Sequence, residues 1–245
     1  MDRRVILVAV ALIAGATIGV DTQKLPDQQA QREALEFHRA GLKFLAGEQF
    51  ERAVEAFSSA IGKDSLLSGA YYGMGQAYMN LQRFPDAAKA YAGCIEASRA
   101  LHVLEQTNQF DADKRREEEI RTLKTILSDP RGIRGPTYTQ MEQHLRDLEN
   151  QRRSISGPFR PPAEVLLALG SAHFKNGDRE AAEEEWKSAT VANPKLGEAH
   201  NNLAVIYMQT GRLDDAEQSL KLAEKAGFRV NPQFKEDLKK KRAGR

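Results

Sequence analysis

The five histidines are the residues of this sequence best able to hold a metal or move a proton. They stand at positions 38, 102, 144, 173 and 200. None has a second histidine three or four residues away, and no His-Glu-x-x-His helix occurs. A metal site on one helix needs ligands that recur at that spacing, so that they share a face. The histidines therefore predict no metal site, and His173 in particular is expected to be a packed core residue.

Other catalytic motifs are also missing from the sequence. The stretch Arg131-Gly132-Ile133-Arg134-Gly135 has two glycines but no lysine in the position of a phosphate-binding loop. No Gly-x-Ser-x-Gly segment occurs, and the single cysteine, Cys94, can form neither an intrachain disulfide nor a thiolate cluster. We therefore predict a protein that is not an enzyme and carries no cofactor and no metal.

The charge of the chain gives no reason to expect nucleic acid as a partner. Its 36 basic and 34 acidic residues leave a net charge of +2, which is too small for steering towards a polyanion. The basic excess is local, with six Lys or Arg and two acids from Lys235 to Arg245. Residues 231–245 are predicted to form a basic, solvated C-terminal helix or tail.

The first twenty residues resemble an export signal. Arg3 and Arg4 precede an apolar or small run from Val5 to Val20, and Ala14-Gly15-Ala16 offers small residues for cleavage. The run is somewhat short for a membrane span, so a cleaved signal and an uncleaved anchor both stay open. Either one predicts an exported location (periplasm, cell envelope or secreted), and membrane contact only through this segment. Residues 21–33 are expected to be a linker.

An internal repeat of 34 residues dominates the rest of the chain. Ala53 and Ala87 are 34 residues apart, and so are Ala182 and Ala216. Twelve residues before each alanine stands a small residue, and four residues after it stands a large one. The small residues are Gly41, Gly75, Gly170 and Ala204, and the large ones are Phe57, Tyr91, Trp186 and Leu220. This alternation is what two closely packed helices require.

The repeat resembles the tetratricopeptide repeat (TPR), a helix-turn-helix unit of 34 residues. The resemblance covers four units, at 34–67, 68–101, 163–196 and 197–230. It implies an all-α fold, a TPR-type α-solenoid in which neighbouring units bury each other's apolar faces.

Between the two pairs of units lies a longer segment, 102–162, that we expect to be an enlarged helical hairpin. From Cys94 to Asp129 there is no glycine or proline, so the second helix of unit two is expected to run on past its usual end. Two apolar stripes mark the hairpin, namely Ile120, Leu123, Ile126 and Leu127, then Met141, Leu145 and Leu148. The charged run 111–119 predicts an exposed helix face. The hairpin either stands in for a repeat within a continuous stack or protrudes as an arm.

The TPR resemblance implies a function in binding another protein, as a peptide or a helix, in a concave groove lined by the first helix of each unit. The groove residues that the resemblance implies are His38, Arg39, Leu42, Leu45, Tyr72, Gln76, Met79, Asn80, Leu167, Ser171, Phe174, Lys175, Asn201, Asn202, Val205 and Gln209. The expected function is a non-catalytic interaction scaffold or assembly adaptor. A self-associating structural repeat protein and a non-catalytic subunit of an envelope enzyme complex remain as alternatives.

Overall fold

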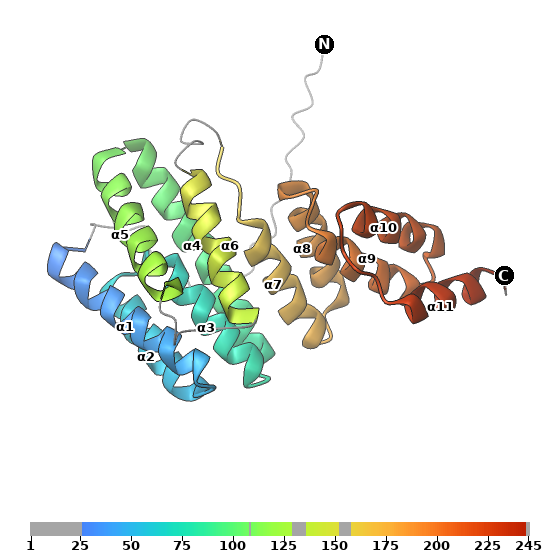
Figure 1. The fold of residues 1–245 in the computed structure, drawn as a ribbon, viewed down its shortest axis with the longest axis horizontal. Helices are drawn as coiled ribbons and strands as arrows, with labels where there is room; N and C mark the ends of the chain where they lie inside the picture. The colour runs from blue at the N-terminus through green and yellow to red at the C-terminus, as the bar shows by residue number, and fades with distance from the viewer. Residues whose placement is uncertain (1–25, 108, 129–135, 152–157, 244–245) are drawn as a thin grey trace, which may run out of the picture.

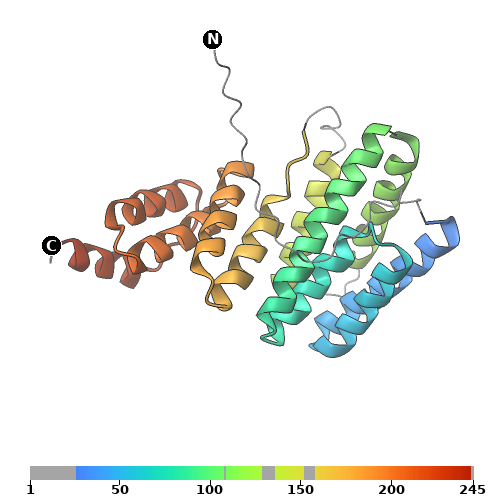
Figure 2. The ribbon, with the colours of Figure 1, turned by 180° about the vertical axis from the view of Figure 1, so that it is seen from behind.

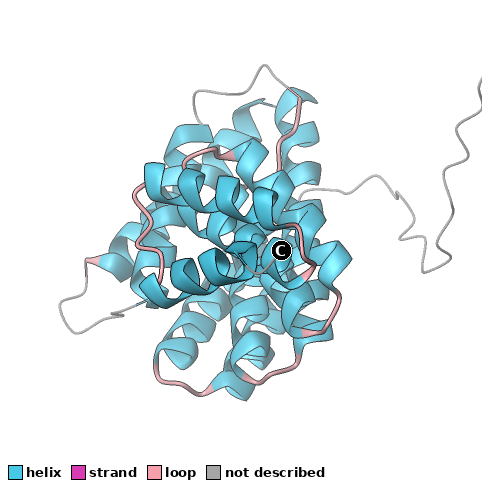
Figure 3. Cartoon of the chain, turned by 90° about the vertical axis from the view of Figure 1, so that its right-hand side faces the viewer, coloured by secondary structure: helices cyan, strands magenta, loops and turns pink. Residues whose placement is uncertain are grey.

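The protein folds into helices throughout the part of the chain that the structure describes. The computed structural model describes residues 26–107, 109–128, 136–151 and 158–243, and within these residues it contains eleven helices and no strand (Figure 3). The predicted all-α fold is therefore confirmed. The expected export signal at 1–20 lies outside the described residues.

Four helix pairs correspond to the four repeat units. The first and second helices of the units are α1 (Gln28–Ala46) with α2 (Phe50–Lys63), α3 (Ser68–Asn80) with α4 (Phe84–Thr107), α7 (Ala163–Lys175) with α8 (Arg179–Ala192), and α9 (Gly197–Gln209) with α10 (Leu213–Lys225). The hairpin consists of α5 (Gln109–Leu127) and α6 (Pro136–Gln151), and α11 (Pro232–Ala243) ends the chain. Figure 1 shows the pairs stacked along the long axis of the molecule.

The repeated small residues are buried where the two helices of each unit meet. Ala53, Ala87, Ala182 and Ala216 are completely buried. Phe57 is also completely buried, and a Cβ atom added at Gly41 or Gly73 would lie within 2.7 Å of its ring. Only glycine leaves room for the ring at these two positions, which explains the small residues of the sequence pattern.

The stack of units continues directly from the second to the third, because α4 packs against α7. The inserted hairpin therefore does not take the place of a repeat between them. It also does not protrude, since α5 packs against α1 and α6 packs against α5. In Figure 1 the hairpin lies on the viewer's side of the first two units, whereas in Figure 2, from behind, α4 comes to the front. The observed arrangement differs from both alternatives that the sequence left open.

The two apolar stripes of the hairpin account for this placement. Ile120, Leu123 and Leu148 form a small buried cluster between α5 and α6, with Leu145 packed against it. Met141 of α6 is buried together with Leu42 of α1 in the core of the first unit. The hairpin thus joins the hydrophobic core of the repeats, and its position is stabilised by apolar burial.

Both ends of the described chain are helical: α1 extends into the expected linker, and α11 is a helix, one of the two forms expected for residues 231–245. Helix α1 begins at Gln28, inside the expected linker 21–33, because the Asp27 side chain caps it by accepting from the amide of Ala30 at 2.8 Å. At the other end, α11 packs against α10 through the buried side chain of Leu238, and Arg242 donates a hydrogen bond to Asp214 at 2.8 Å. Among the described residues, none of the helices is both long and apolar enough to cross a membrane.

Candidate functional site

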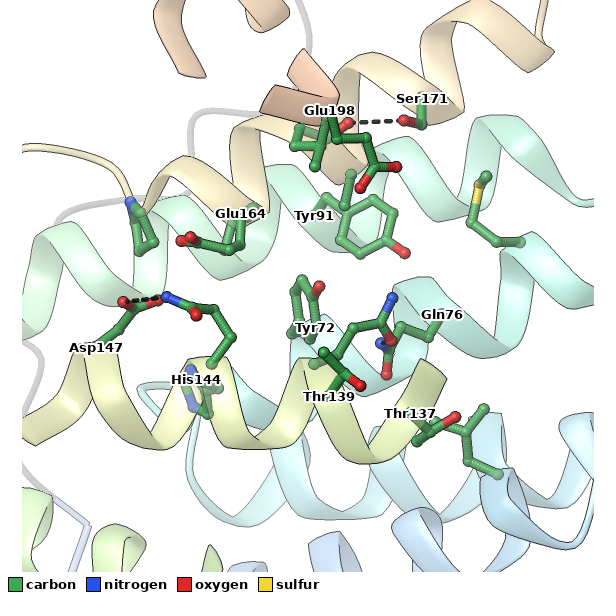
Figure 4. A pocket seen from close by; sticks show the side chains of 18 of the residues that line it. Tyr72, Gln76, Tyr91, Thr137, Thr139, His144, Asp147, Glu164, Ser171 and Glu198 are labelled. Carbon is green, nitrogen blue, oxygen red and sulfur yellow. Dashed lines mark hydrogen bonds between the residues drawn. The ribbon is translucent and has the colours of Figure 1, made fainter. Parts of the chain in front are cut away.

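A cavity of about 1000 Å³ lies between α3, α6 and α7 (Figure 4). Its wall consists mainly of the end of α1, the first helices of units two and three, the inserted helix α6, and the loop between α8 and α9, with single residues from α2, α4 and α9. The lining residues are Leu45, Ala46, Glu48, Phe50, Tyr72, Gln76, Met79, Asn80, Tyr91, Thr137, Thr139, Gln140, Gln143, His144, Asp147, Pro162, Glu164, Val165, Leu167, Ala168, Ser171, Asn193, Lys195, Leu196 and Glu198. A space of this size holds several residues of a peptide.

Seven of the sixteen predicted groove residues line this cavity. They are Leu45, Tyr72, Gln76, Met79, Asn80, Leu167 and Ser171. His38 and Leu42 are instead buried beneath the hairpin, and Arg39 is turned towards Thr122 of α5 at 3.4 Å. The remaining six, Phe174, Lys175, Asn201, Asn202, Val205 and Gln209, lie on α7 and α9 outside the cavity wall. The structure thus brings together all four predicted residues of unit two, two of the four from unit three, and Leu45 from unit one.

Helix α6 supplies the side of the cavity that the sequence did not predict. Gln140, Gln143, His144 and Asp147 follow one another at helical spacing and all line the cavity. They form the polar face of α6, beside the apolar stripe of Met141, Leu145 and Leu148. This polar face is visible in the sequence, but a solvated surface would have the same pattern.

A hydrogen bond between two amide side chains joins α6 to α3 at the cavity. The amide nitrogen of Gln76 donates to the side-chain oxygen of Gln140. One turn further along α3, Asn80 donates to the backbone oxygen of Gln76 at 2.9 Å. Two predicted groove residues therefore already have partners within the chain, and the groove of the first two units is partly occupied by the chain's own α6.

Two tyrosines form the floor of the cavity. The rings of Tyr72 and Tyr91 have centroids 5.5 Å apart and are tilted by 54°, a favourable geometry for an aromatic pair. Tyr91 is only 3% exposed, and its hydroxyl makes no hydrogen bond to any of the described residues. Burial raises the pKa of both phenols well above the usual range, so both hydroxyls keep their protons at neutral pH.

Two carboxyl groups lie close together at one end of the cavity, Asp147 from α6 and Glu164 from α7 (Figure 4). Burial and then the neighbouring Glu164 raise the pKa of Asp147 to about 7, although His144 opposes this effect. Two carboxylates at such a distance repel each other when both are ionised. Asp147 consequently keeps its proton up to a pH close to neutral.

Replacing Asp147 with asparagine should therefore stabilise the fold in alkaline solution. The folded pKa of about 7 lies above the ordinary value of 3.8, so the aspartate loses stability as the pH rises from about 4 to about 7. Solvent screens this half-buried pair, and we expect Asp147→Asn to raise the Tm at pH 8 by roughly 2–4 °C. The gain should shrink below pH 7 and vanish near pH 4. Thermal melts of this variant and of Glu184→Gln, an exposed control on α8, would measure it; equal melts at pH 8 would contradict the prediction.

A buried polar cluster beneath the cavity holds the hairpin on the repeats. Glu119 of α5 accepts from His144 of α6 at 3.1 Å and is itself only 6% exposed. Its carboxylate lies so close to α3 that a Cβ atom added at Gly69 would be 2.8 Å from it, and His38 lies beside the same glycine. The cluster joins α5 and α6 to both α1 and α3.

The protonation states within this cluster follow from its surroundings. Burial lowers the pKa of His38 to about 4, so this imidazole is neutral at physiological pH. Burial also disfavours the charged form of His144, but the hydrogen bond with Glu119 outweighs it and raises the pKa of His144 overall. The same contact holds the pKa of Glu119 below its usual value against the opposing effect of burial. His144 and Glu119 thus form a buried ion pair.

A second buried ion pair corrects the expectation for the charged run 111–119. Arg115 donates to Asp64 at 2.6 Å, and about nine-tenths of both side chains are buried. Arg116 is 2% exposed and donates to Asp113 at 2.7 Å. The predicted exposed face is therefore only part of this helix, because Arg115, Arg116 and Glu119 point into the protein. Within the described residues, no group of His, Cys, Asp or Glu is arranged to bind a metal ion.

Comparison with known proteins places these features in context. No curated protein matches the sequence. Among solved structures, the chain is similar to PilF of Pseudomonas aeruginosa (17% identity, 84% of this chain and 82% of that one, TM-score 0.36). It is also similar to PilW, described as a type IV pilus biogenesis factor (16%, 85% and 82%, 0.37). A third is YrrB, described as a TPR protein with an unusual peptide-binding site (17%, 87% and 94%, 0.32).

The family itself is shown by the repeat segments. The family model described as tetratricopeptide repeat matches residues 38–100 and 167–227, which together make up just over half of the chain. The two matched segments cover most of the four helix pairs, and the interruption between them contains the hairpin that folds back over the first two units. The chain belongs to the tetratricopeptide repeat family, whose fold is that of a protein–protein interaction scaffold.

Proposed function

We propose that this chain is a non-catalytic adaptor that holds a segment of another protein in the cavity between α3, α6 and α7. The observation that carries the proposal is a cavity of about 1000 Å³ on the first helices of units two and three. Its wall combines apolar side chains such as Met79 and Leu167 with amides and hydroxyls such as Asn80 and Ser171. Apolar pockets bind side chains of the partner, and the amides pair with its backbone.

The hairpin limits where such a segment can lie. The first unit has its groove residues His38 and Leu42 buried beneath α5 and α6. A bound segment would therefore enter between α6 and α7 and continue along α9, where Asn201, Asn202, Val205 and Gln209 are only partly buried or exposed. This route differs from a groove that runs along all four units.

A photo-crosslinking residue in place of Met79 would test the proposal in cells that express the full chain. Met79 is half-buried in the cavity wall, so irradiation should join it covalently to a partner protein. The same residue at Ser58, exposed on α2, is the control. Cross-links from position 58 alone would contradict the proposed site, and cross-links to a second copy of the chain would favour self-association instead.

We also propose that the adaptor works outside the cytosol. Support comes from the sequence of residues 1–20, in which two arginines precede the apolar run. Fusing residues 1–25 to a reporter enzyme that is active only after export tests this proposal directly. Activity that survives replacement of Val8 and Leu12 by Asp would contradict it, because a charged run cannot serve as an export signal.

A further inference from the structure

The cavity is acidic, although the chain as a whole is not. Glu48, Asp147, Glu164 and Glu198 contribute carboxyl groups to its wall, and Lys195 is its one lysine. The chain carries a net charge of +2, so the acidity is a property of this site. The four carboxyl groups come from different parts of the chain, and the tertiary structure alone brings them together.

A buried group without a partner gives an independent sign that the site takes a ligand. Tyr91 is 97% buried, its side chain lines the cavity, and its hydroxyl makes no hydrogen bond to the described residues. Figure 4 shows its hydroxyl end directed into the space between α3, α6 and α7. The hydroxyl oxygen itself is open to the cavity, where a ligand group could pair with it. The position calls for a polar ligand group that reaches the floor of the cavity.

We propose that the cavity receives a lysine or arginine side chain of the bound protein segment, an inference that rests on the proposed function. Asp147 and Glu164 would pair with the cationic head, and the Tyr91 hydroxyl would accept a hydrogen bond from it. The aliphatic stem would pack on the apolar wall near Leu167, as long basic side chains do elsewhere. The rings of Tyr72 and Tyr91 add the attraction of aromatic faces for cations.

Binding of a cation should release a proton from the site. Without a ligand, Asp147 keeps its proton up to a pH close to neutral, because burial and the neighbouring Glu164 raise its pKa to about 7. A cation between them removes their mutual repulsion, so the pair would bind as two carboxylates. Of the other charged groups, His144 is already paired with Glu119, and burial raises the pKa of Glu198, which favours its neutral form. Lys195 lies in the loop before α9 and contributes the opposing charge.

A displayed library of random 12-residue peptides, selected on the immobilised full chain, provides the test. Peptides that bind should share a lysine or arginine at one position, and replacing it with norleucine should weaken binding by at least tenfold. The double variant Asp147→Asn, Glu164→Gln should lose the same affinity. A variant with two charges removed from the outer helix α8, Glu180→Gln with Glu184→Gln, should bind normally, since these side chains are exposed.

Calorimetry on a selected peptide separates a specific cation site from general attraction. Titrations in two buffers of different ionisation enthalpy should show that peptide binding releases up to one proton at pH 7. The affinity of the chain for the peptide should fall by at most about tenfold per pH unit below 7. The variant Ser171→Trp fills the cavity. If peptides lose binding to this variant but bind the native chain equally well after norleucine replaces their basic residue, the proposed cation site is wrong and the proposed function stands. A library without any peptide that depends on the cavity would contradict the proposed function, and this inference with it.

Discussion

Replacing Arg115 with methionine should release the hairpin from the repeats and cost about 3–5 kcal/mol of stability. The loss is large because the Asp64 carboxyl group, about nine-tenths buried, would be left without its cationic partner. Asp64 also accepts from the amide of Leu66 at 2.9 Å, which holds its carboxylate in place at the end of α2. Methionine preserves most of the side-chain volume, so the effect would report the lost charge.

Hydrogen exchange measured along the chain distinguishes this effect from a general loss of stability. Amides of α5 and α6 should exchange much faster in the variant, whereas those of α9 and α10 should change little, because α5 packs on α1 and not on the C-terminal units. Arg121→Met is the matched control, since Arg121 is exposed on the same helix. If the two variants exchanged alike, the buried ion pair could not be what holds the hairpin.

Phe57→Ala should destabilise the first two units by about 3–5 kcal/mol, the usual cost of truncating a fully buried aromatic side chain. Phe57 is 0% exposed and sits between the backbones of α1 and α3, at Gly41 and Gly73. Its removal would leave a cavity between three helices that is hard to close, because α1 and α3 are also held by the hairpin cluster. Thermal and denaturant unfolding would measure the loss.

Two further variants show whether the tight fit at Phe57 is the cause. Phe37→Ala makes the same chemical change at a side chain that is 39% exposed and should cost far less. Gly73→Ala should destabilise by about 1–3 kcal/mol despite the better helix propensity of alanine, since its Cβ would meet the ring. Gly62→Ala, with nothing within 4 Å, should instead stabilise α2 by about 0.5–1 kcal/mol. A stabilising Gly73→Ala would show that the ring can move aside.

The repeat units could be predicted from the sequence because their packing is local and periodic. Ala53 and Ala87, and Ala182 and Ala216, occupy equivalent positions 34 residues apart, and all four are fully buried. A period of this kind specifies which faces of neighbouring helices meet, since each unit contacts mainly the next one. The extension of α4 to Thr107 followed from the absence of glycine and proline in the same way.

The position of the hairpin could not be predicted, because an apolar stripe shows which face of a helix is buried but not what buries it. The apolar stripes place Met141 and Leu123 on the buried faces of their helices, yet only the folded chain shows that Met141 packs with Leu42 of α1. The contacts that hold the hairpin join residues far apart in sequence, such as Arg115 with Asp64.

The candidate site likewise has one part that the sequence predicts and one part that it does not. The 34-residue repeat predicts the TPR helices, and the family resemblance implies groove residues of which seven, on α1, α3 and α7, line the cavity. That α6 closes this wall and brings Asp147 close to Glu164 follows only from the folded chain. A charged or amide side chain on a helix has the same sequence pattern in water and in a cavity, because the pattern does not show which helix packs beside it.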